Sequence, residues 1–233
     1  MSGHLLKYNR GMTLVELLVV LSIFAIISMT VAFNYSSYKS TTSTNVLAQD
    51  VALSIREAQG YAMGVKSVSS AGSSIFPGYG VHFSPSGSGP ISGSSKSFIL
   101  FADIPFDINN PQDKGDSEYG FPVSGGANES ACDGSVLGSD NECISVITIS
   151  GGDKILGVCA NSECEDLTPN PNGSLDIVFR RPNPDAVFCY RANVGDISCA
   201  NEISSVGIIV QSESDQNILK KIVVWNTGQI SVE

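Results

Sequence analysis

The sequence predicts an α+β protein in which one long N-terminal helix is followed by a β-rich globular domain. Three observations predict it: an apolar run near the N-terminus, an apolar stripe at helical spacing behind it, and then short apolar segments separated by Gly, Pro and Ser. A chain of 233 residues is long enough for one medium-sized domain and such a helix. No internal repeat is visible, so we expect a single domain over residues 67–233.

The first apolar segment is interrupted by one carboxylate, that of Glu16. From Leu17 to Phe33 it would be roughly 26 Å long as a helix, at about 1.5 Å per residue, which nearly matches a bilayer core of about 30 Å. Lys7 and Arg10 precede it, and the positive-inside rule then keeps the N-terminus in the cytoplasm. We therefore expect a membrane-spanning helix over residues 12–38 and an extracytoplasmic domain behind it.

A second apolar pattern predicts that the helix continues over residues 39–66 as an amphipathic helix. Its apolar residues recur every three or four positions: Leu47, Val51, Ile55, Ala58, Ala62 and Val65. A helix with one apolar face packs that face against another element, here the predicted sheet. The run from Ser67 to Gly78 is rich in Ser and Gly and is predicted to end the helix, with the first strand behind it.

Several later segments are predicted to be strands because their apolar residues alternate with polar ones or run continuously over a short length. They are Tyr79–Phe83, Ser97–Ala102, Cys143–Ile149, Ser174–Phe179, Ala186–Arg191, Val206–Gln211, Leu219–Trp225 and Gln229–Val232. The tripeptide Asn226-Thr227-Gly228 joins the last two of them. It predicts a hairpin turn in which Gly228 takes a positive φ.

The charge and the cysteines limit the partners and the compartment. With a formal net charge of −10, the chain is a poor ligand for nucleic acids, and we expect no nucleic-acid partner. Its six cysteines all lie in the second half: Cys132, Cys143, Cys159, Cys164, Cys189 and Cys199. Their even number and short spacings indicate disulfides formed in an oxidising compartment, and pairing between neighbours is the simplest connectivity. A zinc site is the alternative, but no C-x-x-C is present and His4 and His82 are not at ligand spacing.

The run Gly11-Met12-Thr13-Leu14-Val15-Glu16-Leu17-Leu18 resembles the class III signal of type IV prepilins, a short basic leader ending in Gly before T-L-[IV]-E-L-L and a long apolar run. The resemblance implies that a prepilin peptidase removes the leader, residues 1–11, and methylates the new amine of Met12. An ordinary secretory signal is the alternative, but it leaves Glu16 unexplained and lacks an A-x-A-like cleavage site. A carboxylate in a membrane helix needs a partner. The resemblance implies that this partner is the amine of a neighbouring subunit.

Four further segments resemble the H-type minor pseudopilins and their pilus relatives: residues 47–67, 78–83, 97–103 and 220–233. The cysteine-rich insertion near 120–172 has no counterpart in them. The resemblance implies a pilin-like fold, with the helix laid against an antiparallel β-rich domain. It also implies that the subunit crosses the inner membrane once and then joins other pilin or pseudopilin subunits through the inner-membrane assembly platform. The filament would be a pilus, a competence pilus or a type II secretion pseudopilus.

The sequence offers no support for an enzyme. It has no nucleophile elbow, no H-E-x-x-H and no phosphate-binding glycine loop, and a structural subunit needs no cofactor. An acidic cluster could supply oxygen ligands for calcium: Asp103, Asp107, Asn109, Asp113 and Asp116. A solvated acidic loop is the preferred interpretation, because the spacing is not that of an EF-hand. Two other functions stay open, a pilus-borne adhesin whose insertion binds a surface and a DNA-uptake pilin, which would need a basic stripe.

Overall fold

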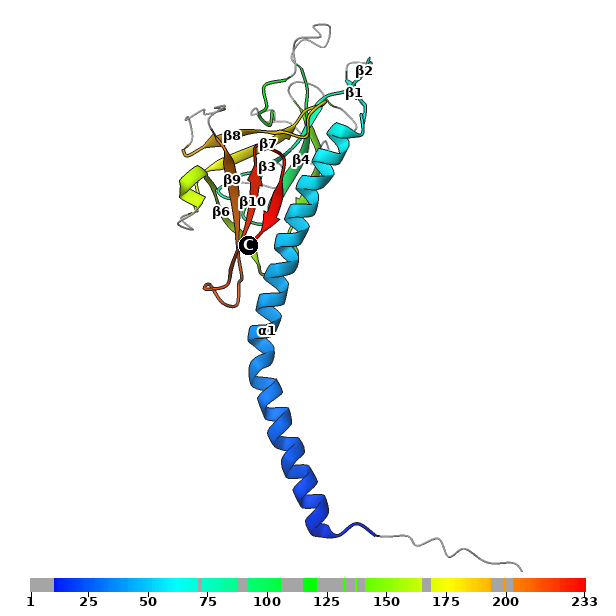
Figure 1. Cartoon of the computed structure of the whole chain (residues 1–233), viewed down its shortest axis with the longest axis vertical. Helices are drawn as coiled ribbons and strands as arrows, with labels where there is room; N and C mark the ends of the chain where they lie inside the picture. Colours follow the sequence, from blue (N-terminus) through cyan, green and yellow to red (C-terminus); the bar gives the residue numbers. More distant parts are fainter. Residues whose placement is uncertain are drawn as a thin grey trace, which may run out of the picture. The chain divides into compact units, whose positions relative to one another are not determined.

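The computed structural model describes residues 11–70, 73–87, 92–105, 115–120, 132, 137, 141–164, 169–193, 199 and 203–233. The chain divides into two compact units, Met1–Lys39 and Ser40–Glu233. The first described element is helix α1, Leu14–Met63, drawn from blue to cyan in Figure 1. Within the described residues the other regular elements are strands and one 3₁₀ helix, and all of them lie in the second unit.

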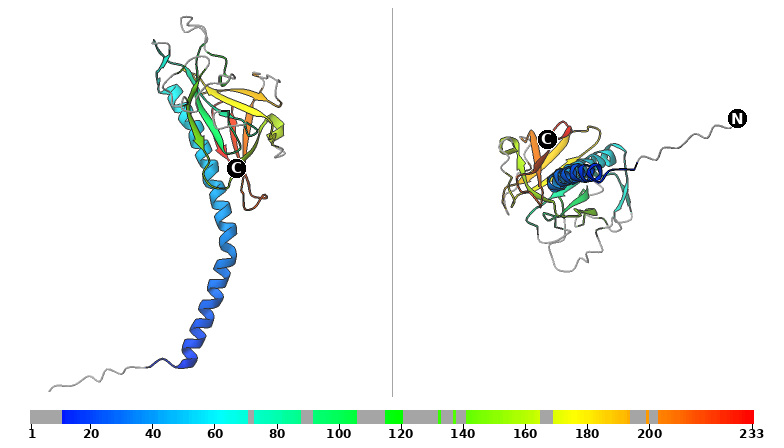
Figure 2. Two further views of the ribbon diagram at one scale, coloured as in Figure 1. Left: turned by 180° about the vertical axis from the view of Figure 1, so that it is seen from behind. Right: turned by 90° about the horizontal axis from the view of Figure 1, so that it is seen from below.

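The part of α1 within the second unit packs through one apolar face. Both views in Figure 2 show it lying against the strands. Its buried residues are Leu47, Ala48, Val51, Ala52, Ile55, Ala58 and Ala62. They belong to one hydrophobic cluster with residues of both large sheets, which confirms the predicted apolar stripe over these positions. Burial of several such side chains, at about 0.8 kcal/mol per methylene, fixes the helix to the sheets.

Helix α1 ends earlier than the periodicity predicts, and Val65 is not part of the buried face. Val65 has a φ of 55° and is 46% exposed. The backbone N–H of Lys66 donates to the carbonyl of Tyr61 at 3.2 Å, which is the pattern of a Schellman C-cap with Val65 in the left-handed position. The expectation that the helix extends to residue 66 was therefore wrong by three residues.

A five-stranded antiparallel sheet has the strand order β5-β4-β3-β7-β8. Its strands are β3 (Gly78–Phe83), β4 (Ser97–Asp103), β5 (Cys143–Thr148), β7 (Ser174–Phe179) and β8 (Ala186–Arg191). One face carries the alternate residues Tyr79, Val81 and Phe83, which join the main core with the helix. The other face carries Ile99, Phe101, Cys143 and Val178, and Tyr119 and Cys132 pack against them.

A four-stranded antiparallel sheet has the order β11-β10-β9-β6. Its strands are β6 (Lys154–Ala160), β9 (Ser205–Gln211), β10 (Leu219–Trp225) and β11 (Ile230–Val232), and β6 is followed by a 3₁₀ helix, η2 (Asn161–Cys164). The turn between β10 and β11 contains Gly228 with a φ of 79°, as the sequence predicted. Gln59 on α1 donates to the carbonyls of Gly228 and Pro184, each at 3.2 Å, and so ties the helix to this turn.

Every strand expected from the sequence is present, within two residues at each end. Two features were missed. The Ser- and Gly-rich segment after the helix forms a short hairpin of β1 (Val68–Ser70) and β2 (Ser73–Ile75). The second is β6, which is interrupted by a register shift between Ile155 and Gly157 where it pairs with β9. Both lie in glycine-rich sequence, where the alternation of apolar and polar residues is weak.

Candidate processing and assembly site

The predicted cleavage site lies in an irregular segment immediately before the first helix. Gly11, Met12 and Thr13 have no regular secondary structure, and all three are exposed. A Cβ placed on Gly11 would meet nothing within 4 Å in this conformation. The start of the helix therefore does not cover the bond between Gly11 and Met12.

Thr13 caps the N-terminus of α1. Its hydroxyl accepts the backbone N–H of Glu16 at 3.2 Å, and its carbonyl accepts the N–H of Leu17 at 3.1 Å. The spacing T-x-x-E is that of a capping box. Because the Thr13 hydroxyl already caps the helix, the Glu16 carboxylate is not the main cap and is exposed in the first turn.

The helix behind this cap is apolar on every side. Leu17, Leu18, Ile23, Phe24 and Ile27 are each about half exposed or more. One helix of the described chain, α1, is long and apolar enough to cross a membrane by its length and composition. A helix that is apolar all round is stable only in lipid or among other helices, so this segment indicates membrane anchoring.

The hydroxyl residues inside the apolar segment do not disturb it. Ser22 donates to the carbonyl of Leu18 at 2.8 Å, and Thr30 donates to that of Ile27 at 2.8 Å. Both hydroxyls therefore satisfy their hydrogen bonds within the helix, which lowers the cost of placing them in lipid. The helix continues without a break into the second unit.

A short exposed segment, a capped apolar helix and a carboxylate in its first turn are the features of a prepilin-type signal and its membrane anchor. A family profile described as the prokaryotic N-terminal methylation motif matches residues 6–32. The match supports the type IV prepilin-like family and therefore processing by a prepilin peptidase and assembly with other pilins. No curated protein and no solved structure matches the chain. The likeness to H-type pseudopilins consequently has no support beyond the sequence segments that suggested it.

The described cysteines form three disulfides: Cys132–Cys143, Cys159–Cys164 and Cys189–Cys199. Each joins neighbours along the chain, the connectivity that the spacing favoured. Cys159–Cys164 links the end of β6 to η2, and Gly207 on β9 makes room for it. A Cβ on Gly207 would lie 2.6 Å from the sulfur of Cys159. The disulfides close short loops, which lowers the entropy of the unfolded chain.

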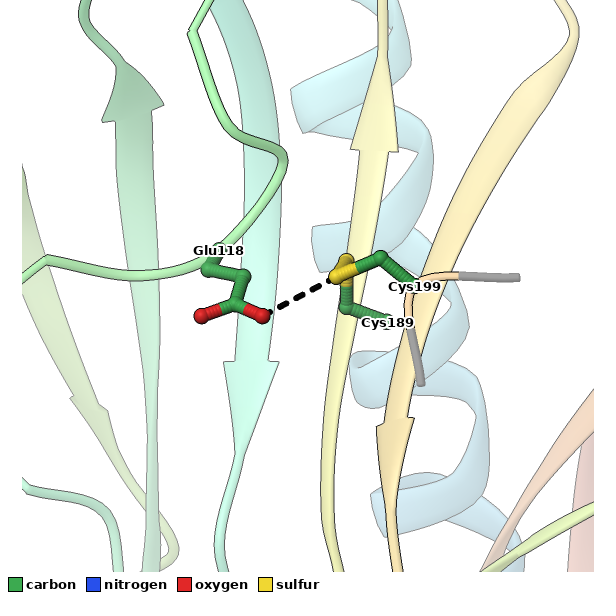
Figure 3. A group of neighbouring side chains, drawn as sticks. All are labelled: Glu118, Cys189 and Cys199. Carbon is green, nitrogen blue, oxygen red and sulfur yellow. Dashed lines mark hydrogen bonds between the residues drawn. A yellow bond between two sulfur atoms is a disulfide. The ribbon is translucent and has the colours of Figure 1, made fainter. Parts of the chain in front are cut away.

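The alternative zinc interpretation can be compared with one group of side chains. Figure 3 shows Glu118 beside Cys189 and Cys199, with ligand atoms all within 4.8 Å of one another. A carboxylate oxygen of Glu118 lies 3.0 Å from the sulfur of Cys199. The two sulfurs are bonded to each other, however, and a metal binds thiolates rather than disulfide sulfurs. The Glu118 carboxylate instead pairs with the guanidinium of Arg191.

Asp103 does not belong to a solvated acidic loop, which corrects that expectation for this residue. It is fully buried at the end of β4, where its carboxylate pairs with Arg180 and accepts the backbone N–H of Ser117 at 3.2 Å. The Asp103 carboxylate is therefore already neutralised by the guanidinium of Arg180. Asp107, Asn109 and Asp113 lie outside the described residues. Asp116 is exposed, and its carboxylate accepts the backbone N–H of Glu118 at 2.9 Å.

A second buried carboxylate, Glu142, lies next to Asp103 and was not singled out from the sequence. Its two oxygens accept the backbone N–H groups of Ile104 at 2.7 Å and Gly120 at 2.6 Å. Burial raises the pKa of Glu142 from 4.5 to about 9, against the opposing effect of these two hydrogen bonds. Burial also raises the pKa of Asp103 from 3.8 to about 6, although Arg180 lowers it.

We expect the folded protein to be most stable at mildly acidic pH. Both carboxyl groups have a higher pKa in the folded chain than in the unfolded chain. Between pH 4 and 9 the folded state therefore holds more protons than the unfolded state. Its stability falls as the pH rises through this window. Melting of the full chain in phosphocholine micelles at pH 5 and at pH 8 should give a lower melting temperature at pH 8. Glu142→Gln should flatten the dependence above pH 7, whereas the exposed Glu213→Gln should not change it. A melting temperature that rises steadily from pH 5 to pH 8 would contradict the assignment.

The face of the five-stranded sheet that lies away from the main core also holds a buried histidine. Nδ1 of His82 on β3 lies 2.6 Å from Oδ1 of Asp176 on β7, and the ring of Tyr119 lies 5.0 Å from the His82 ring. The register pairs His82 with Asp176 directly. The sequence carried a signal for this pair, because His82 alternates with Val81 and Phe83, and Asp176 alternates with Leu175 and Ile177. Both polar residues therefore share the face that the main core does not use.

Proposed function

We propose that the chain is a structural subunit, a minor pilin or pseudopilin, of a type IV pilus-like filament or type II secretion pseudopilus. One observation carries the proposal: an apolar helix exposed on every side begins just after an exposed segment, and the methylation motif matches across both, over residues 6–32. Such a helix needs lipid before assembly and other helices after it. The proposed role requires no catalytic group and no bound cofactor.

The proposal orders the events at the N-terminus. The precursor waits in the inner membrane with its β-rich unit on the extracytoplasmic side, where the three disulfides form. Prepilin peptidase cuts after Gly11 and methylates Met12. The new cationic amine then pairs with Glu16 of a neighbouring subunit as the helix enters the filament, so that charge pairing sets the axial register. The assembly platform and the other subunits of the filament are the partners.

Cleavage is tested at the N-terminus of the mature protein. We expect membrane-extracted protein to begin at Met12 and to carry a methyl group on its amine. Mass spectrometry of the intact protein and of its N-terminal peptide measures both. Gly11→Val, which adds a branched side chain at the scissile bond, should accumulate as precursor in the membrane.

A mature N-terminus beyond residue 25 would identify an ordinary secretory signal and would exclude the filament proposal. Deleting the peptidase gene supplies the control, because precursor should then accumulate for the parent chain as it does for Gly11→Val. Ser2→Ala, a change in the leader away from the cleavage site, serves to distinguish loss of processing from loss of expression.

A further inference from the structure

The four-stranded sheet carries a cavity on the face that lies away from the main core. Its volume is ≈ 340 Å³, and it is lined by residues of β9, β10, η2 and the last residue of the chain. The polar and aromatic lining residues are Asn161, Ser204, Ser205, Lys221, Trp225 and Glu233. None of them takes part in the processing site or in the membrane helix.

The strand register explains why these side chains meet. Trp225 on β10 is paired with Ser205 on β9, and Lys221 exchanges backbone hydrogen bonds with Glu233 at 2.8 and 3.0 Å. Lys221 and Trp225 are four residues apart on one strand, so both point to the same face. Their neighbours Ile222 and Val224 alternate with them and are fully buried in the main core.

The wall opposite β10 is held rigidly. Asn161 begins η2 with a φ of 51°, and its side-chain oxygen accepts both the backbone N–H and the hydroxyl of Ser204, at 2.9 and 3.1 Å. The disulfide Cys159–Cys164 closes the loop that contains Asn161. A preformed site of this kind loses little conformational entropy when a ligand binds.

The two charged side chains that line the cavity, those of Lys221 and Glu233, are paired with each other. Nζ of Lys221 lies 3.0 Å from a carboxylate oxygen of Glu233 and donates to the carbonyl of Cys164 at 3.3 Å. A neutral ligand can hydrogen-bond to these two groups without separating them. The site therefore favours a neutral ligand that has one apolar face for Trp225 and several hydroxyl groups for the surrounding donors and acceptors.

We propose that this cavity binds a neutral saccharide. A pyranose ring presents axial C–H groups on one face and hydroxyl groups around its edge, which matches an aromatic ring surrounded by hydroxyl, amide and paired charged groups. A peptide of neutral side chains has no comparable ring of hydroxyls. The inference does not depend on filament assembly, since the site is complete within one chain.

Trp225 is the single tryptophan of the chain and reports on the cavity directly. The full-length protein is kept in phosphocholine micelles, because maltoside detergents would themselves supply a saccharide. Maltohexaose, cellohexaose and chitohexaose are titrated up to about 10 mM, in the millimolar range expected of a weak single site. We expect a saturable change in Trp225 fluorescence with at least one of them.

The variants separate binding in this cavity from other effects, with calorimetry as the readout that does not need tryptophan. Trp225→Ala should weaken binding roughly tenfold or more, and Trp225→Tyr should keep most of it. Ser205→Leu fills the cavity opposite Trp225 and should abolish the fluorescence change while the reporter remains. Phe76→Ala removes another exposed aromatic residue and should leave binding unchanged.

Three outcomes would overturn the proposal. The first is the absence of a saturable change with all three oligosaccharides. The second is binding that survives in folded Ser205→Leu, which would place the saccharide elsewhere. The third is a saturable change with a tryptic digest of casein but with no oligosaccharide, which would make the cavity a peptide site.

Discussion

Glu16→Gln is expected to be inserted and cleaved like the parent, yet to enter filaments roughly tenfold less well or worse. The substitution keeps the size of the side chain and removes its charge. Breaking a buried ion pair by removing one partner typically costs about 3–5 kcal/mol, and in a filament the cation left behind would be the mature amine of Met12. The amounts of protein in sheared-filament and membrane fractions measure the effect.

The geometry of the helix start provides a matched control. The Thr13 hydroxyl, rather than the Glu16 carboxylate, accepts the orphan backbone N–H at the helix start. Thr13→Val removes this cap and costs about 1 kcal/mol of helix stability, but it keeps the charge at Glu16. We expect Thr13→Val to assemble nearly as well as the parent. If Glu16→Gln assembles equally well, charge pairing is wrong, and Glu16 contributes only about 0.3–1 kcal/mol through the helix dipole.

The helix and most strands were predictable because local periodicity determines which face is buried. Leu47, Val51, Ile55, Ala58 and Ala62 recur at helical spacing, and each is buried as expected. The end of the helix was less predictable. Val65 continues the apolar spacing, but the chain reverses there through a left-handed residue, a conformation that β-branched side chains rarely adopt.

Strand β6 was missed because its stabilising contacts are remote in sequence. Gly151 and Gly152 come before it and Gly157 interrupts it, so its own residues give a weak strand signal. Its partner is β9, about fifty residues later, where Ile208, Ile209 and Val210 supply the apolar surface. Pairing of this kind cannot be derived from the local pattern.

The candidate processing residues come from a local motif, whereas the environment of a buried carboxylate depends on residues remote in sequence. Gly11, Met12 and Glu16 follow from a local motif and are exposed in the described structure, and their roles in processing and assembly stay predictions. Asp103, by contrast, appeared to belong with its acidic neighbours because they are adjacent in sequence. Its partner is Arg180, which is 77 residues away in sequence. Strand β3 lies between β4 and β7, and the Arg180 side chain reaches Asp103 across it at Gly78, which has no side chain.

Arg180→Met is expected to destabilise the β-rich unit by roughly 3 kcal/mol, because it leaves the carboxylate of Asp103 buried without its cation. Asp103 has no exposed side-chain area, and Nε of Arg180 donates to it at 2.9 Å. The Arg180 side chain passes over β3 at Gly78. A Cβ on Gly78 would lie 3.0 Å from Cγ of Arg180. For a unit of this size the loss corresponds to roughly 10 °C in melting temperature, measured by Trp225 fluorescence of the full chain in micelles.

The adjacent Arg181 gives the control for this pair. It is exposed and lies over the ring of Phe76, so Arg181→Met should lower the melting temperature only slightly. The double variant Asp103→Leu with Arg180→Met replaces the ion pair by apolar groups and should recover most of the loss. The defect of Arg180→Met should also shrink at pH 5, where Asp103, with a pKa already raised to about 6 in the parent, takes up a proton. Equal destabilisation by Arg180→Met at pH 5 and pH 8 would show that packing of the arginine stem, rather than its charge, stabilises this edge of the sheet.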